Sequence, residues 1–180
     1  MTERFVHYAV EPVRAVQDCP QYGGRATRGD KPNGMWFSVD GDGDGWSEWC
    51  KGEKFGLERL KVRTQIIFHL DAKILRLSNA KAIRRFTKTY GVNPDWMRDA
   101  RFGNMVYGID WPRIAKRYDG IIIAPYVWSC RLDHSTFWYY GWDCASGVVW
   151  RARAVKALKV LRRRSNTSTI RNVKSKVEVE

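Results

Sequence analysis

The residues best suited to chemistry are gathered in one stretch, from Trp138 to Trp150. It places the carboxylate of Asp143 and the thiol of Cys144 among large aromatic side chains and a run of small residues. Small residues let a ligand approach the backbone, aromatic rings offer flat faces, and a carboxylate among them is held at a controlled distance from water. The stretch is therefore predicted to form one wall of a ligand pocket, built as two short strand-like pieces.

Cys144 is a candidate nucleophile because the chain also supplies histidines that could activate it. No recognisable catalytic signature surrounds it, so a small buried thiol is the expected role. The four cysteines are widely spaced and form no CxxC pair, which indicates neither a zinc site nor a disulfide framework. Reduced thiols are expected.

Length and charge set the domain organisation. A chain of 180 residues with 44% hydrophobic residues fits one domain with a substantial core, predicted over residues 1–158. Residues 159–180 are predicted to be a basic tail, because residues 151–176 carry 10 Lys and Arg and no acid in a chain with a net charge of +13. Such a tail predicts contact with nucleic acid or another anionic partner through Arg162, Arg163 and Arg164, with a merely solvated tail as the alternative.

The chain lacks an apolar run long enough to span a membrane and begins without a signal sequence, so a cytoplasmic protein is expected. The Asp/Gly run at 40–45 matches the start of an EF-hand loop. Lys51 occupies the twelfth position, where a bidentate Glu is required, and a turn without metal is the prediction.

Residue periodicity predicts the elements that must position the candidate site. Residues 62–70 and 73–77 are expected to form a hairpin or two adjoining strands, and Ser47 is a candidate helix N-cap. Further strands are predicted at 5–10, 35–39 and 121–126, and further helices at 82–90 and 110–118. Strands dominate and helices fall between them, which predicts an α+β fold with a mixed, mostly antiparallel sheet rather than a doubly wound parallel sheet.

Four short motifs follow one another in a recognisable order. They are a His7-Tyr8 strand, a Gly34 to Ser38 strand, a Tyr118-Asp119-Gly120 turn before a buried strand, and a late Val148-Val149-Trp150 strand. Together, over most of residues 5–158, they resemble ADP-ribosyltransferase domains of the diphtheria-toxin-like branch, which include DarT-like and small bacterial or phage enzymes.

The resemblance implies a split sheet that binds NAD as a substrate. It implies that His7 hydrogen-bonds the NAD ribose beside Tyr8, that the 34–38 strand flanks the nicotinamide, and that the turn at Asp119 is structural. The predicted NAD-binding residues are His7, Tyr8, Gly34, Trp36, Ser38, Tyr140 and Ser146, and the predicted catalytic residues are Asp143, His7 and Ser38.

One position departs from the family. Its catalytic Glu precedes a strand of the Tyr-Val-Val-Phe type, and here Ser146 occupies that place. Cleaving the nicotinamide–ribose bond builds positive charge on the sugar, which a nearby carboxylate stabilises. Asp143, three residues earlier, is the nearest acid and the candidate for this role, with turn capping as the alternative.

The expected function is thus NAD-dependent ADP-ribosyl transfer to a nucleic acid or a nucleic-acid-associated protein. Two alternatives remain open from the sequence. The chain can be a non-catalytic nucleic-acid-binding protein on the same fold, in keeping with the missing Glu, or an enzyme that cleaves a nucleobase N-glycosidic bond in DNA or RNA.

Overall fold

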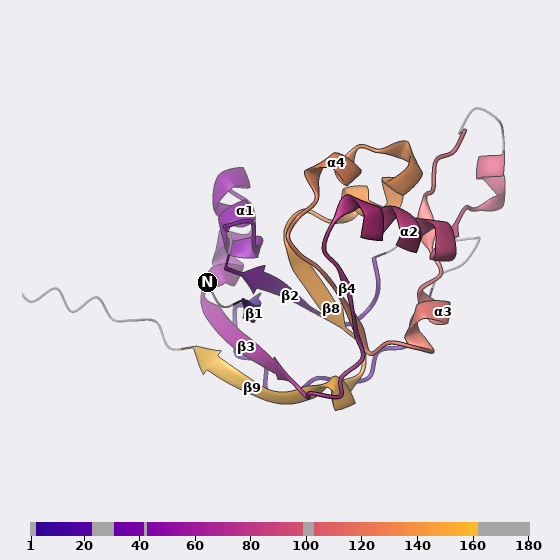
Figure 1. The fold of residues 1–180 in the computed structure, drawn as a ribbon. Coiled ribbons are helices and arrows are strands. Elements are labelled where there is room, and N and C mark those ends of the chain that lie inside the picture. Colours follow the sequence, from indigo (N-terminus) through magenta and orange to yellow (C-terminus); the bar gives the residue numbers. More distant parts are fainter. Residues whose placement is uncertain (1–2, 23–30, 42, 99–102, 162–180) are drawn as a thin grey trace, which may run out of the picture.

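The computed structural model describes residues 3–22, 31–41, 43–98 and 103–161. A seven-stranded sheet runs through these residues in the order β4-β7-β8-β2-β1-β3-β9 (Figure 1). Its strands are β1 (Arg4–Ala9), β2 (Met35–Asp40), β3 (Val62–Phe68), β4 (Ile74–Leu77), β7 (Gly120–Ile123), β8 (Ser146–Val149) and β9 (Val155–Leu161). A small second sheet pairs β5 (Gly91–Val92) with β6 (Gly108–Ile109).

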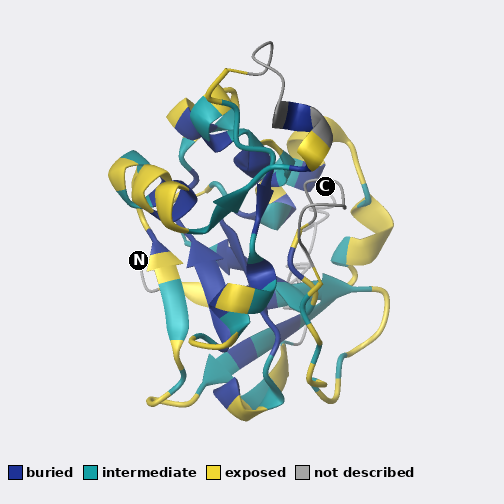
Figure 2. Ribbon diagram, turned by 90° about the vertical axis from the view of Figure 1, so that its right-hand side faces the viewer, coloured by how far each residue is buried: buried dark blue, intermediate teal, exposed yellow. Residues whose placement is uncertain are grey.

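The large sheet is mixed and mostly antiparallel, which confirms the predicted α+β class. Strands β4 and β7 pair in parallel, whereas the other neighbouring strands of this sheet run antiparallel. Strands β7 and β8 are buried along their whole length, and buried strands fill the middle of the molecule in Figure 2. Continuous apolar sequence such as Ile121–Ile123 is what a strand covered on both faces requires.

The predicted pairing of residues 62–70 with 73–77 is wrong. β3 lies between β1 and β9, whereas β4 forms the opposite edge of the sheet beside β7. His69 at the end of β3 donates its backbone N–H to the carbonyl oxygen of Ala154, and the chain then turns away at the exposed Leu70. Alternation of apolar residues identifies a strand, but it does not select that strand's partner.

Around the sheet, the described residues form the α-helices α1 (Trp46–Glu53), α2 (Ala80–Tyr90), α3 (Trp111–Ala115) and α4 (Trp128–Arg131). Short 3-10 helices are η1 (Leu57–Leu60), η2 (Asp95–Arg98), η4 (His134–Gly141) and η5 (Ala152–Ala154). In Figure 1, α1 lies beside β1 and β2, and α2, α3 and α4 gather at the end of the sheet formed by β4, β7 and β8. Within the described part of the chain, no helix has the length and apolar character to cross a membrane.

Helix ends follow local side-chain chemistry in most places. Asn79 accepts a hydrogen bond from the backbone of Ala82 to cap α2, and Asp110 caps α3 in the same way. Ser47, however, is buried inside α1, and Gly45 is the N-cap. A Cβ at Gly45 would lie 2.7 Å from the hydroxyl of Ser38, so the close approach of β2 requires glycine here.

The aromatic stretch is helical in its first half, contrary to the strand-like prediction. Residues His134–Gly141 form η4, and only Ser146–Val149 form a strand. The indole N–H of Trp138 donates to the hydroxyl of Thr87 on α2 over 2.7 Å, which directs this ring into the core between the helices. Core packing therefore takes precedence over the strand propensity of these aromatic residues.

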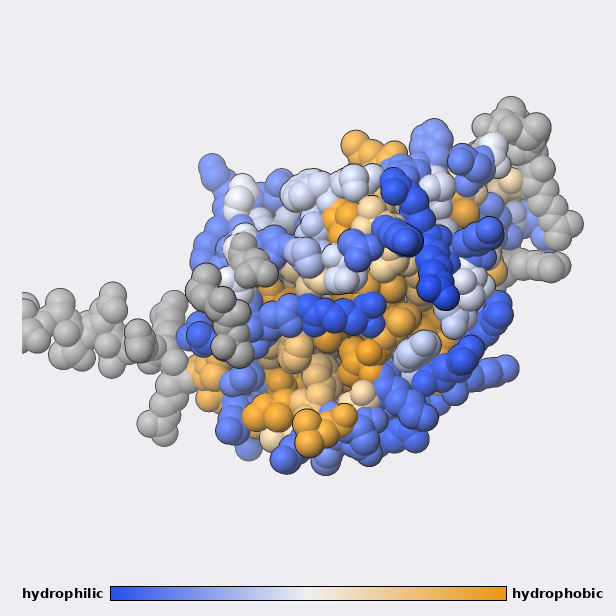
Figure 3. Space-filling view, in the orientation of Figure 1, coloured by the Kyte–Doolittle hydropathy of each residue, from blue (hydrophilic) through white to orange (hydrophobic). Residues whose placement is uncertain are grey.

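Hydrophobic side chains gather over the part of the sheet between β9 and α2, with hydrophilic residues around them (Figure 3). The most deeply buried large side chains include Trp111, Tyr139, Trp142 and Trp150. β9 continues to Leu161, three residues past the expected domain boundary at 158. Arg162, Arg163 and Arg164, the predicted nucleic-acid contacts, lie outside the described residues.

Candidate functional site

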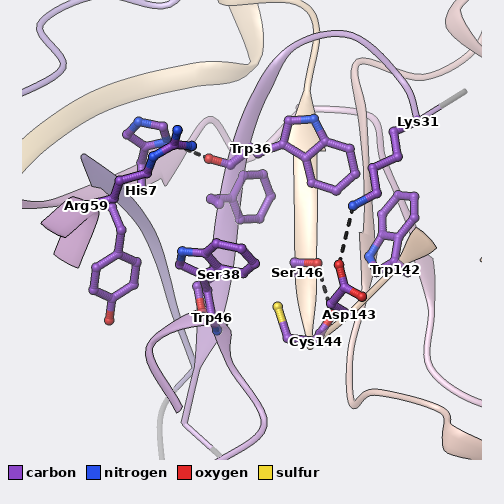
Figure 4. A pocket seen from close by; sticks show the side chains of 12 residues that line it. His7, Lys31, Trp36, Ser38, Trp46, Arg59, Trp142, Asp143, Cys144 and Ser146 are labelled. Carbon is purple, nitrogen blue, oxygen red and sulfur yellow. Dashed lines mark hydrogen bonds and ion pairs between the residues drawn. The ribbon is translucent and has the colours of Figure 1, made fainter. Parts of the chain in front are cut away.

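A pocket of about 320 Å³ opens between β1, β2, α1 and the segment that leads into β8 (Figure 4). Six of the predicted site residues line it together with six others. The lining residues are His7, Tyr8, Lys31, Trp36, Phe37, Ser38, Trp46, Arg59, Trp142, Asp143, Cys144 and Ser146.

Strand register brings these distant segments together. Ser38 on β2 lies opposite Ser146 on β8 on one side and opposite Val6 on β1 on the other. Trp36 and Ser38 share one face of β2, and both line the pocket together with Phe37 between them. The sheet thus places β8, β2 and β1 side by side.

The imidazole of His7 has a fixed orientation. Its Nδ1 lies 2.6 Å from the carbonyl oxygen of Trp36. A carbonyl oxygen only accepts hydrogen bonds, so Nδ1 carries the proton and donates it. Nε2 is then the ring nitrogen left to interact with a ligand.

A hydrogen-bonded chain crosses from β1 to α1 beneath the pocket. The phenol of Tyr8 donates to Asp40 over 2.7 Å, and the hydroxyl of Ser38 donates to the other carboxylate oxygen of Asp40 over 2.5 Å. The backbone N–H of Trp46 in turn donates to the hydroxyl of Ser38 over 2.8 Å. Burial and then the Asp40 carboxylate raise the pKa of Tyr8 well above its usual value, so the phenol remains a donor.

This chain determines what Ser38 can do. Its only hydroxyl proton is donated to Asp40, and its oxygen already accepts one bond from the backbone at the start of α1. The arrangement suits a residue that holds α1 and Trp46 against β2. For direct catalysis, Ser38 would first have to release Asp40.

The carboxylate of Asp143 lies at the pocket wall between two cations. Its Oδ2 is 3.6 Å from the ammonium of Lys31, and its Oδ1 is 3.4 Å from the guanidinium of Arg131. The side chain is 24% exposed, so it contacts both the protein and the pocket. Asp133, by comparison, caps a turn because its carboxylate accepts the backbone N–H of Ser135, and it also pairs with Arg84.

Two tryptophans complete this corner of the pocket. The ring of Trp36 lies 4.8 Å from that of Trp142, and the Lys31 ammonium sits 5.3 Å from the centre of the Trp36 ring. The indole N–H of Trp142 is buried and has no hydrogen-bond partner among the described residues. We call the set formed by Asp143, Trp36 and Trp142 the cation corner, because its carboxylate and ring face both attract positive charge.

Cys144 borders the same pocket but is 4% exposed. Burial raises the pKa of its thiol to about 12, so the neutral thiol persists at physiological pH. Ser146, where a Glu is expected from the resemblance, donates its hydroxyl to the carbonyl oxygen of Cys144 over 3.0 Å. Neither side chain supplies a negative charge to the pocket.

Two predicted NAD-binding residues lie outside the pocket lining. Gly34 has a φ of +146°, and a Cβ there would collide with the carbonyl oxygen of Val149, so this glycine lets β2 start against β8. Tyr140 is 48% exposed and stacks on Phe137 with ring centres 5.9 Å apart. The turn at Asp119 is structural as expected, because its buried carboxylate accepts the backbone N–H of Lys73 and pairs with Arg153.

The pocket also contains residues that the sequence did not single out. Lys31 and Arg59 come from segments without regular periodicity, whereas Trp46 follows the Asp/Gly turn directly. In that turn, the carboxylate of Asp40 accepts hydrogen bonds from Tyr8 and Ser38, and the carboxylate of Asp44 accepts the backbone N–H of Tyr126 over 2.7 Å. The described residues contain no cluster of His, Cys, Asp and Glu suited to a metal ion.

Searches against protein-family models, curated proteins and solved structures return no match for this chain. Its function therefore has to be inferred from the pocket itself.

Proposed function

We propose that the protein is an NAD-dependent ADP-ribosyltransferase that acts on a nucleic acid or a nucleic-acid-associated protein. The cation corner carries this proposal. The nicotinamide ring of NAD is flat, bears a positive charge and has a carboxamide oxygen that accepts hydrogen bonds. The corner offers the carboxylate of Asp143 and the face of Trp36 to such a ring.

The chemistry follows from these groups. When the bond between nicotinamide and ribose breaks, its electrons move to the ring, and positive charge develops on the sugar carbon. A carboxylate at the pocket wall stabilises that charge while an acceptor attacks. Nε2 of His7 is oriented to hydrogen-bond a ribose hydroxyl, and Arg59 adds positive charge for a pyrophosphate.

The fold is compatible with the resemblance in the sequence. The His7 strand, the Trp36–Ser38 strand and the Val148–Val149 strand are adjacent in one sheet and border one pocket. The finer assignment to the ADP-ribosyltransferase fold remains part of the proposal.

The direct experiment is incubation with NAD labelled on its adenine, followed by measurement of label transfer and of free nicotinamide. Asp143→Asn should lower nicotinamide release by about 100-fold or more, because it removes the charge that stabilises the transition state. Asp71→Asn, an exposed aspartate in the turn before β4, is the matched control and should leave the rate unchanged. Wild-type protein that releases no nicotinamide with DNA, RNA or protein acceptors would overturn the proposal.

A non-catalytic nucleic-acid-binding protein is the second candidate. The presence of Ser146 at the position of the family's Glu, and the pairing of Asp143 with two cations, favour it. It predicts steeply salt-dependent binding to nucleic acid without detectable affinity for NAD. An enzyme that cleaves nucleobase N-glycosidic bonds would instead release a free base in the absence of NAD.

A further inference from the structure

A group of exposed rings lies next to the pocket on α4 and η4. The indole of Trp128 is 68% exposed and the phenol ring of Tyr140 is 48% exposed. The guanidinium of Arg131 is within reach of both, 5.9 Å from the Trp128 ring and 5.3 Å from the Tyr140 ring. We call Trp128, Arg131 and Tyr140 the aromatic platform.

The platform is joined directly to the candidate catalytic carboxylate. Arg131 places one nitrogen 3.4 Å from Asp143 and donates from another to the phenol of Tyr126 over 3.0 Å. Behind Tyr140, the rings of Phe137 and Tyr107 continue the stack with centres 5.9 and 6.0 Å apart. The exposed rings are thus held by buried or partly buried neighbours beside the pocket.

The chemistry of the platform fits an unpaired nucleobase. Bases have flat faces that stack on aromatic rings and on guanidinium groups, and in a duplex those faces are covered by neighbouring base pairs. Exposed aromatic rings gathered at one place on the surface are a feature of interaction sites. A cationic protein with aromatic rings at its surface is the combination that single-stranded nucleic acid requires.

The surrounding charge supports the same occupant. Helix α2 packs against α4 and η4, and it exposes Lys81, Arg84, Arg85 and Lys88. The nearby acid Asp133 is paired with Arg84 over 3.0 Å, and Asp143 is paired with Arg131 and Lys31. A phosphate backbone that leaves the platform therefore meets positive charge on α2.

We propose that the aromatic platform binds single-stranded nucleic acid and stacks one unpaired base beside Asp143. This inference rests on the proposed function in naming that base as part of the acceptor. The platform's binding to the strand is independent of turnover and is measured separately.

The test is fluorescence anisotropy of labelled single-stranded DNA and RNA oligonucleotides, with the matching duplex, on the full-length protein. Trp128→Leu keeps an apolar side chain without an aromatic face and should weaken single-strand binding about tenfold, whereas Trp128→Phe should stay within about threefold of wild type. Leu70→Ala, an exposed apolar position in the turn after β3, is the control and should not change binding. Titrations at about 200 mM salt suppress non-specific contacts of the basic tail.

Two further measurements separate this proposal from the proposed function. Nicotinamide release without acceptor should be the same in Trp128→Leu and wild type, whereas label transfer to the oligonucleotide should fall with binding. If the wild-type protein never cleaves NAD but Trp128→Leu still loses binding to the single strand, the platform is supported and the proposed transferase activity is overturned. Equal binding by Trp128→Leu and wild type, or tighter binding to duplex, would overturn the platform. Label transfer to protein alone would overturn the assignment of the stacked base as part of the acceptor. Comparing DNA with RNA identifies which of the two nucleic acids the platform binds.

Discussion

At the scale of single residues, Lys31 occupies the position that a positively charged ligand would take. Its ammonium lies between the carboxylate of Asp143 and the face of Trp36, and the side chain is 47% exposed. An exposed ion pair is weak, typically below about 1 kcal/mol, so an incoming cation can displace it. Lys31 is thus an internal competitor for the cation corner.

Replacing Lys31 by Met removes this competitor. We expect Lys31→Met to bind NAD about three- to fivefold more tightly, because the ligand no longer displaces an ion pair of that strength. Isothermal titration calorimetry with NAD and with NADH, whose nicotinamide ring is uncharged, provides the measurement. Tighter binding of NADH than of NAD, or weaker NAD binding in Lys31→Met, would contradict a cation site at this corner.

At the scale of elements, the pocket depends on the close contact of β2 with β8. Gly34 opens β2 with a φ of +146°, and any Cβ there meets the backbone of Val149. This contact aligns Ser38 with Ser146 further along the same pair of strands. Gly34 therefore helps to set the shape of the pocket although it does not line it.

Gly34→Ala should destabilise the protein by about 2–4 kcal/mol, because a positive φ and a backbone collision add together. The matched control is Gly52→Ala in α1, where a Cβ contacts nothing within 4 Å and alanine favours the helix. Urea unfolding of both variants measures the two changes in free energy. Equal stability of Gly34→Ala and wild type would show that β2 and β8 can move apart without any loss of folding free energy.

Most strands and the caps of α2 and α3 were predictable because their signals are local, whereas the predicted cap Ser47 lies inside α1. The alternation in 62–68, the apolar run at Ile121 and the caps Asn79 and Asp110 all depend on neighbouring residues. The parallel partner of β4 and the helical form of η4 were not predictable, since both depend on contacts far along the chain. Lys31 enters the site through an irregular segment, for which periodicity carries no information.

At the scale of the whole molecule, alkaline pH should be destabilising. Burial raises the pKa of Cys144 from 9.0 to about 12, and it also raises the pKa values of Cys50, Cys130, Tyr8 and Tyr139. These groups keep their protons in the folded protein and lose them earlier when it unfolds. Their contribution is therefore fully present below about pH 9 and is lost as pH rises toward the folded pKa values.

Urea unfolding at about pH 8 and about pH 10 should show that the wild type loses stability as the pH rises and that Cys144→Ala loses less. The Cys144 thiol accounts for a loss of up to about 1.4 kcal/mol per pH unit above its unfolded pKa. The comparison is made between the slopes of stability against pH, because the substitution also shifts stability at every pH. Identical slopes for the variant and wild type would show that the Cys144 thiol titrates alike in both states.

The order of strands in the sheet has a consequence for synthesis. The pocket needs β1, β2 and β8, which come from the beginning and near the end of the described chain. Contacts this distant in sequence form late in folding. A nascent chain or a fragment that stops before Ser146 carries His7 and Trp36 but lacks β8, which pairs with β2 and β7 and follows Asp143. Any activity of this pocket is therefore withheld until almost the entire domain has been made, and proteolysis before β8 abolishes it.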